Sequence, residues 1–350
     1  MNAPHTSIRV WLEEKEEHLS PYATKSRLSK GRLWPEEPCS TRTVFQRDRD
    51  RVIHCKAFRR LKHKTQVFIA PLGDHYVTRL THTLEVSQIA RSIARGLNLN
   101  EDLTEAIALG HDLGHTPFGH TGEEVLNEIS PSGFRHNEQS LRVVDFLEKG
   151  GKGLNLTGEV REGILKHSKS RVDIMGEGWE TVDTLEGQIC KIADIIAYIN
   201  HDIDDALRAD IIKESEIPRS TIHALGQSRS ERINTVICDI LDHSWAARGE
   251  GLTDGQIQPM IGMSPPVNEI MNTLRAFLFI RVYDSELVNR EAEKAKKIVH
   301  LLYEYFMGHE KELPQEYALC GEPLVNRVVD HVAGMTDQYA IRTAADLGLS

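Results

Sequence analysis

The chain of 350 residues lacks several features that mark well-known protein classes. Its cysteines are few and scattered, with no paired spacing, which argues against a disulfide framework or a cysteine-based zinc site. No apolar run reaches the length of about 18 residues that a membrane span needs, and the N-terminus has no apolar signal-peptide core. We therefore expect a cytoplasmic protein with reduced thiols and no membrane partner.

Strand-like alternation is also scarce, and the sequence contains neither an internal repeat nor a GxxxxGKS or GxxxxGKT phosphate-binding loop. Apolar residues recur mostly at three- and four-residue steps, which predicts an all-α fold. Helices are predicted over residues 79–96, 101–112, 121–129, 136–148, 157–167 and 183–208, with a basic helix over 41–64. We expect residues 1–40 to form an N-terminal arm, 41–210 the core that carries the chemistry, and 211–350 a C-terminal helical region packed on that core.

The densest group of polar residues lies inside an apolar, glycine-rich stretch at 108–121. It contains His111, Asp112, His115 and His120 within ten positions. An adjacent histidine and aspartate offer an imidazole nitrogen and a carboxylate oxygen to one cation, which suits zinc, manganese, iron, cobalt or nickel. The two later histidines could handle protons beside that metal. A helix end with surface histidines is the alternative, but it leaves polar residues in a buried-looking run unexplained.

Further metal ligands are predicted on two neighbouring helices. His82 lies four residues before Val86, on the inward face of the first of them, although a lone inward histidine is more often a core residue. On the second helix, Asp194, Tyr198 and Asp202 form a stripe at four-residue steps, beside a stripe of isoleucines. An aspartate flanked by isoleucines is costly to bury unless it is paired or bound to metal. His201 is expected to lie off the Asp194 stripe, so replacing it should matter less than replacing a metal ligand.

The order His82, His111-Asp112, Asp194 resembles the HD superfamily of metal-dependent phosphohydrolases. Segments 58–68, 78–82, 110–120, 134–140 and 193–198 narrow the resemblance to the deoxynucleoside triphosphate (dNTP) triphosphohydrolases, in particular the short bacterial dGTPase-like members. The resemblance runs from about Thr41 to Arg208 and more weakly to Tyr283.

The resemblance implies an all-α HD-domain fold with additional C-terminal helices. It also implies hydrolysis of dNTPs to deoxynucleoside and tripolyphosphate with a divalent metal ion (Mn, Mg, Fe, Co, Ni or Zn). The implied metal ligands are His82, His111, Asp112 and Asp194. The residues implied to surround the reacting phosphate, as general acid or base or as phosphate contacts, are His115, His120, Glu123 and His136. For Glu123, stabilising the start of a helix through the helix dipole is the alternative.

Substrate contacts are a separate set in this resemblance. Gln66 matches the position that hydrogen-bonds the sugar 3′-hydroxyl, with Asp202 as its partner. Tyr198 matches the aromatic residue under the deoxyribose, and Arg79 a phosphate-contacting arginine. Arg275 and Tyr283 resemble a phosphate ligand and a second sugar contact, with an amphipathic core helix as the alternative.

The charge distribution suggests a polyanionic partner. The chain carries a net charge of −10, yet residues 42–64 contain nine Lys or Arg against two Asp. A local cationic patch on an anionic protein fits a triphosphate, a nucleotide activator or single-stranded nucleic acid, and a solvated helix face is the alternative. The overall charge argues against a protein devoted to duplex DNA. The resemblance also implies a homo-oligomer.

Two other functions stay open on the sequence. The first is another HD phosphohydrolase that acts on nucleoside monophosphates or guanosine polyphosphates. The second is a scaffold that senses nucleotides or nucleic acid through a vestigial HD site. The complete set of four predicted ligands argues against the scaffold.

Overall fold

The computed structural model describes residues 7–69, 76–168, 173–176, 179, 181–250, 259–318 and 321–349. These residues are mostly helical, and their only β-type pairings are the isolated bridges Arg32–Thr157 and Thr65–Thr78. The all-α prediction is therefore confirmed. No helix among them is long and apolar enough to cross a membrane. The cysteines in these ranges are free thiols, and Cys320 lies outside them.

The α-helices are α1 (Ile8–Lys15), α2 (Val44–His54), α3 (Lys56–Arg60), α4 (Arg79–Gly96), α5 (Glu101–Gly110), α6 (His120–Ile129), α7 (His136–Arg142), α8 (Glu148–Gly151), α9 (Gly158–Lys166), α10 (Leu185–Arg208), α11 (Arg219–Leu225), α12 (Arg229–His243), α13 (Pro265–Leu278), α14 (Glu286–Gly308), α15 (Leu324–Gly334) and α16 (Asp337–Asp346). Shorter 3₁₀ helices span Glu16–His18, Ser26–Leu28, Leu61–His63, Glu214–Glu216, Trp245–Arg248, Glu310–Glu312 and Gln315–Tyr317, and π-helical turns span Val143–Leu147 and Phe279–Tyr283.

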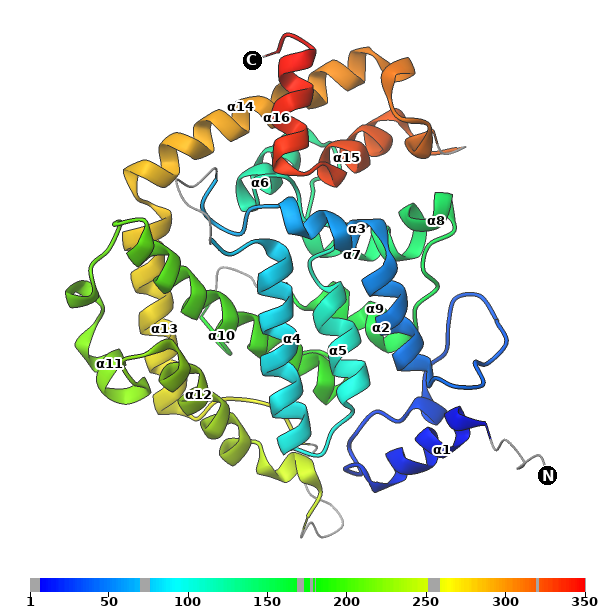
Figure 1. Ribbon diagram of the computed structural model, residues 1–350, viewed down its shortest axis with the longest axis vertical. Helices are drawn as coiled ribbons and strands as arrows, with labels where there is room; N and C mark the ends of the chain where they lie inside the picture. Colours follow the sequence, from blue (N-terminus) through cyan, green and yellow to red (C-terminus); the bar gives the residue numbers. More distant parts are fainter. Residues whose placement is uncertain are drawn as a thin grey trace.

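Helices α4, α5 and α10 form the centre of the molecule (Figure 1). Each begins with a side-chain cap, at Thr78, Asn100 and Thr184, which satisfies backbone N–H groups that have no partner inside a helix. The isoleucine stripe of α10 and the apolar face of α4 are fully buried against each other. The polar stripe of α10 is therefore fixed beside the ends of α4 and α5.

The predicted basic helix over 41–64 is wrong as a single element. The chain leaves helical geometry at Cys55, which ends α2 and begins α3. The Cys55 sulfur accepts a hydrogen bond from Phe58 N at 3.3 Å, and Glu148 Oε1 accepts one from Ala57 N at 2.8 Å. These acceptors satisfy the first N–H groups of α3 and stabilise the break.

The basic side chains of this segment mostly find partners within the same chain. Arg49 reaches Asp50, Asp102 and Glu105, and Arg51 reaches Glu36 and two backbone carbonyls. Other ion pairs are Arg42–Asp50, Arg47–Glu36, Lys56–Glu316 and Arg60–Glu316. Internal pairing reduces the charge that this surface offers to a polyanion, so binding of nucleotide or nucleic acid here stays a prediction.

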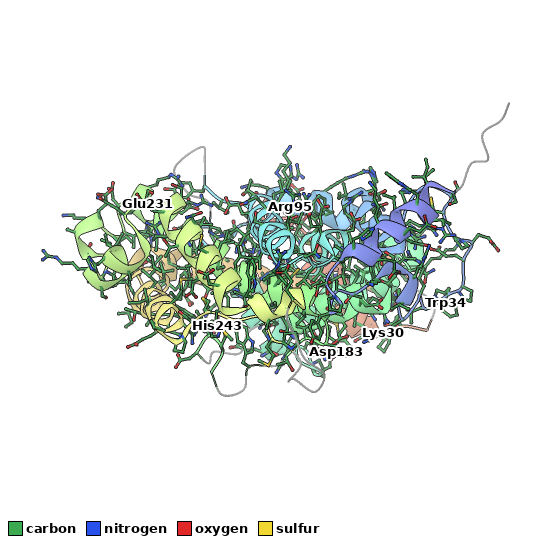
Figure 2. All side chains as sticks on the ribbon, turned by 90° about the horizontal axis from the view of Figure 1, so that it is seen from below. Lys30, Trp34, Arg95, Asp183, Glu231 and His243 are labelled. Carbon is green, nitrogen blue, oxygen red and sulfur yellow. The ribbon has the colours of Figure 1, made fainter. Side chains whose placement is uncertain are left out.

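The N-terminal residues pack on the core. Glu186, in the first turn of α10, accepts hydrogen bonds from Thr24 N and from Asn100 N. Lys30 lies beside Asp183, with the ammonium 3.3 Å from the carboxylate (Figure 2). This part of the chain is therefore tied to the helices of the centre.

Helices α14, α15 and α16 form a layer above α6 (Figure 1). They bury a second hydrophobic core that also contains Phe118, Leu126 and Phe134. Asp330 of α15 accepts hydrogen bonds from Gln139 and Arg142 of α7. The C-terminal helices thus contact the segments on both sides of α6.

Candidate metal and catalytic site

The four predicted metal ligands come together from three places in the fold. His82 lies in the first turn of α4, His111 and Asp112 follow the end of α5, and Asp194 lies in the middle of α10. The ligand atoms of His82, His111 and Asp112 lie within 4.8 Å of one another, and His82 Nε2 lies 3.2 Å from Asp194 Oδ1. All four side chains are buried.

The orientation of His111 fits a ligand role. Its Nδ1 lies 2.7 Å from the carbonyl oxygen of Ala108, an acceptor that requires a proton on Nδ1. The lone pair of the neutral ring is then on Nε2, which is buried and has no hydrogen-bond partner in the described ranges. A buried nitrogen lone pair beside two carboxylates and a second imidazole fits a divalent cation. This donor set suits several metals and selects none of them.

Arg79, the first residue of α4, is paired with the proposed ligand Asp112. Its Nη1 donates to Asp112 Oδ2 at 2.7 Å, and both side chains are buried. Burial would raise the pKa of Asp112, but the electrostatic interactions with His111 and then Arg79 outweigh burial and hold that pKa well below its usual range. Arg79 therefore helps to keep the Asp112 carboxylate ionised. From the sequence, Arg79 was predicted only as a phosphate contact.

A second polar group lies next to the ligands and contains the four predicted catalytic residues. Glu123 Oε1 lies 2.8 Å from His136 Nδ1, and Glu123 Oε2 lies 2.9 Å from His120 Nδ1. The rings of His115 and His136 are stacked with centroids 4.5 Å apart. The structure thus brings all four residues together.

Glu123 gives the two stacked histidines different proton affinities. Burial lowers the pKa of His136, but the charge and hydrogen bond of Glu123 outweigh burial and raise that pKa. For His115, burial and then the charge of Arg79 hold the pKa well below its usual range. A histidine of raised proton affinity stacked on one of lowered proton affinity is a pair of groups that can donate and accept protons.

The carboxylate of Glu123 lies in the first turn of α6, as the alternative reading required. It also accepts a hydrogen bond from the backbone N–H of His136 at 2.8 Å. The residue therefore stabilises the start of α7 as well as facing the dipole of α6.

The predicted substrate contacts flank the same stretch of α10. Tyr283 donates a hydrogen bond to Asp202, so its π-helical turn reaches the polar stripe. Burial raises the pKa of Tyr198, and Arg275 opposes that shift through its charge and a side-chain hydrogen bond. Gln66 Oε1 is buried without a hydrogen-bond partner among the residues placed in the structure.

Arg275 and Tyr283 are therefore in contact with Tyr198 and Asp202. The alternative of an amphipathic core helix also describes α13, since Leu274 and Leu278 on it are fully buried. The two readings are compatible because α13 buries Leu274 and Leu278 in the core, while Arg275 reaches Tyr198 on α10.

Two protein families match separate parts of this chain. Residues 79–199 match the HD domain, and residues 261–346 match the phosphohydrolase-associated domain. The chain is 53% identical over 337 residues to the deoxyguanosinetriphosphate triphosphohydrolase-like protein of Caldanaerobacter subterraneus subsp. tengcongensis, covering 95% of this chain and 94% of that protein. Proteins of the same name from Desulfatibacillum aliphaticivorans and Clostridium tetani are 49% and 46% identical, over 96% and 97% of this chain and 96% of each relative.

The chain belongs to the deoxyguanosinetriphosphate triphosphohydrolase-like family. This dGTPase-like chain is accordingly an all-α hydrolase with an HD domain. The HD match runs from α4 into α10 and includes all four proposed ligands. The phosphohydrolase-associated match includes α13 to α16.

Two histidines of the dGTPase-like site were missed from the sequence. His167 follows α9, and its Nε2 lies 3.1 Å from His136 Nε2 and 3.9 Å from Asp112 Oδ1. Burial lowers the pKa of His167 to about 3. His167 therefore lies between the four proposed metal ligands and the proton-handling group, which consists of His115, His120, Glu123 and His136. Its place at the end of a helix gave no periodic signal in the sequence.

His201 is the second missed residue: the sequence placed it off the Asp194 stripe, and the structure places it against His82. Its Nε2 lies 2.9 Å from His82 Nδ1, and its Nδ1 lies 2.7 Å from Asp202 Oδ1 without the alignment of a hydrogen bond. Seven residues make almost two full helical turns, so His201 is rotated from Asp194 by only about 20° around α10. The seven-residue spacing between Asp194 and His201 could therefore have predicted from the sequence that the two side chains lie on the same face of α10.

Proposed function

We propose that this chain hydrolyses dNTPs to deoxynucleoside and tripolyphosphate, with a divalent metal held by His82, His111, Asp112 and Asp194. The buried, unpartnered Nε2 of His111 inside this group carries the proposal. The names of the related proteins support a nucleoside triphosphate as substrate.

The reaction requires water to attack the α-phosphorus, the bond from phosphorus to the sugar O5′ to break, and a proton to reach O5′. A divalent metal supplies polarisation of a phosphoryl oxygen and a lower pKa for water. His115, which is neutral, can accept the proton of the attacking water. His136, whose proton affinity Glu123 raises, can donate a hydrogen bond or a proton to the phosphate side. His120 shares the Glu123 carboxylate and is the more exposed partner.

Sugar recognition is assigned to the polar groups around α10. The free acceptor on Gln66 suits the 3′-hydroxyl of a deoxyribose. Tyr198 can pack under the sugar, with Asp202 and Tyr283 as its neighbours. Arg79 and Arg275 are the candidate phosphate contacts.

The test is to incubate the protein with Mn²⁺ or Mg²⁺ and each dNTP, singly and in mixtures, and to identify the products by mass. Tripolyphosphate and deoxynucleoside are expected. Orthophosphate or pyrophosphate would instead indicate another HD phosphohydrolase. Faster turnover in mixtures, followed together with particle size, would reveal the proposed nucleotide activator and homo-oligomer.

A pair of variants on α10 separates the metal site from general damage. Asp194→Ala should remove both bound metal and turnover. Asp204→Ala is the matched control, because Asp204 lies on the same helix and faces Arg229 and Arg232. Full metal content in Asp194→Ala would contradict the assignment.

A further inference from the structure

Lys64 is buried where an exposed, anion-binding side chain was expected. Only 2% of the residue is exposed. Its ammonium donates to the carbonyl oxygen of His115 and, at 2.9 Å, to that of Ala333. Ala333 lies in the last turn of α15, where the negative end of the helix dipole favours a cation. One side chain thereby connects the end of α15 to the backbone of a proposed catalytic histidine.

Asp337 makes the complementary contacts from the start of α16. It is buried and lies in the first turn, where the helix dipole favours an anion. Its Oδ1 accepts a hydrogen bond from Phe118 N at 2.9 Å, and its Oδ2 accepts one from Thr65 N at 2.8 Å. Hydrogen bonds to a charged acceptor are stronger than neutral ones. We call these two residues the Lys64–Asp337 pair.

The segment between His115 and Phe118 needs such support. Phe118 has a φ of +61°, a conformation that a non-glycine residue adopts only when its surroundings impose it. Its side chain is buried in the second core with residues of α14 to α16. Both the backbone and the side chain of Phe118 are therefore fixed by the C-terminal helices.

The other segment held by the pair leads to the proposed sugar contact. Thr65 directly precedes Gln66, and the carbonyl of Lys64 accepts a hydrogen bond from Arg79 N at 3.0 Å. The two side chains thus touch the segments that carry His115 and Gln66, and the backbone of Lys64 holds the start of α4 at Arg79. None of these contacts involves a proposed metal ligand.

We propose that Lys64 and Asp337 are positioning residues, through which the phosphohydrolase-associated helices set the geometry of the proton-handling loop and of Gln66. The kinetic part of this inference rests on the proposed function. The structural part concerns only the backbone of residues 115–118 and can be measured without turnover.

The experiment compares Asp337→Asn and Lys64→Met with a matched control, Glu186→Gln. Glu186 is also a buried carboxylate in the first turn of a helix that accepts hydrogen bonds from two backbone N–H groups, but it holds Thr24 and Asn100. For each protein we would measure unfolding by urea, bound metal, kcat and KM, and amide hydrogen exchange of peptides spanning residues 113–120.

Both test variants should exchange faster over residues 113–120 and lose kcat by about tenfold to a hundredfold, because small misplacement of catalytic groups is costly. Bound metal should stay at the wild-type level, since His82 and Asp194 lie on α4 and α10, His111 and Asp112 directly follow α5, and the pair contacts none of these four residues. Glu186→Gln should lose stability while its kcat and its exchange over 113–120 stay within about twofold of wild type, since it leaves the catalytic geometry intact. Asp337→Glu, which keeps both acceptor oxygens, should recover part of the protection and of kcat relative to Asp337→Asn.

Wild-type exchange over 113–120 together with wild-type kcat in Asp337→Asn and Lys64→Met would overturn the inference. So would equal losses of kcat in Glu186→Gln, which would reduce the pair to general stabilisation. If the wild-type protein releases no tripolyphosphate, the proposed function fails, and the exchange measurement still decides whether the pair holds the loop.

Discussion

Gly114 lies between Asp112 and His115 and packs directly against the backbone of α7. A Cβ atom at this position would lie 2.1 Å from Ser140 N, 2.3 Å from the carbonyl carbon of Gln139 and 2.8 Å from the carbonyl oxygen of His136. All three atoms belong to the backbone, so no side chain can rotate away. The substitution Gly114→Ala must therefore displace α7 or the loop as a whole.

The size of the effect follows from the contacts that such a displacement breaks. Gly114 N donates to Ser140 Oγ at 2.9 Å, and Ser140 Oγ donates to the carbonyl of His111 at 2.7 Å. Each buried hydrogen bond contributes about 1 kcal/mol net, and overpacking costs about 1–3 kcal/mol. We expect Gly114→Ala to lower the free energy of unfolding by about 3–5 kcal/mol. Because α7 begins at His136, a displaced α7 should also increase the distance between His136 and His115.

Two other glycines provide a graded comparison. A Cβ on Gly110 would meet the end of the Ile164 side chain at 2.7 Å, which can move, and a Cβ on Gly308 would meet nothing within 4 Å. Urea unfolding of the three alanine variants should rank Gly114 as most destabilised, Gly110 as intermediate and Gly308 as changed by less than about 1 kcal/mol. A Gly114→Ala protein within about 1 kcal/mol of wild type would refute the argument, since the clash should cost more than that.

Four further predictions follow from the site and its surroundings. Gln66→Ala should lower dNTP turnover by about ten- to hundredfold and reduce the difference in rate between dNTPs and their 2′,3′-dideoxy analogues. Equal turnover of the two substrate types by the wild-type protein would count against the role of Gln66 in binding the 3′-hydroxyl. His201→Ala should weaken metal affinity by about tenfold to a hundredfold in a metal titration, because it removes the partner that orients His82, and unchanged affinity would contradict this. Burial lowers the pKa of His331 from 6.5 to about 4, so between these pH values the unfolded chain binds a proton that the folded chain does not. The free energy of unfolding should therefore fall as pH drops from 6.5 to 4, by at most about 3 kcal/mol. His331→Phe should make this fall with pH smaller, and an unchanged pH dependence would refute the assignment. Charge reversal at Arg49 and Arg51 should weaken polyanion binding at low salt and leave bound metal intact. If the variant keeps wild-type polyanion affinity and particle size at two salt concentrations, these arginines serve only the internal ion pairs.

The central helices could be predicted because their signals are local. The helix predicted over 79–96 has the observed bounds of α4, and the one over 183–208 begins two residues before α10. Both combine a repeated apolar spacing with a threonine cap, so the sequence contains their starts as well as their periods. His82 and Asp194 on these helices lie beside His111 and Asp112 in the structure, and their role as metal ligands stays a prediction.

The break at Cys55 and the role of Lys64 depend on residues far away in the chain. Glu148 caps α3 from 91 residues further along the chain than Ala57, and the carbonyl of Ala333 in α15 accepts a hydrogen bond from the Lys64 ammonium. Propensity and local charge favoured one long, solvated basic helix, and tertiary contacts overrode both. His167 was missed for the same reason, since only the crossing of α9 with α7 and the loop after α5 brings it to Asp112.

Helix α10 acts as a ruler between the two halves of the proposed chemistry. Asp194 stands at the metal group, and Tyr198 and Asp202 stand at the sugar contacts one and two turns further along the same rigid rod. Each added residue advances a helix by about 1.5 Å and turns it by about 100°, so one inserted residue would point the sugar contacts in another direction. Under the proposed function, exchanging side chains on α10 should change which sugar is accepted, whereas a change in the number of residues between Asp194 and Asp202 should end activity altogether.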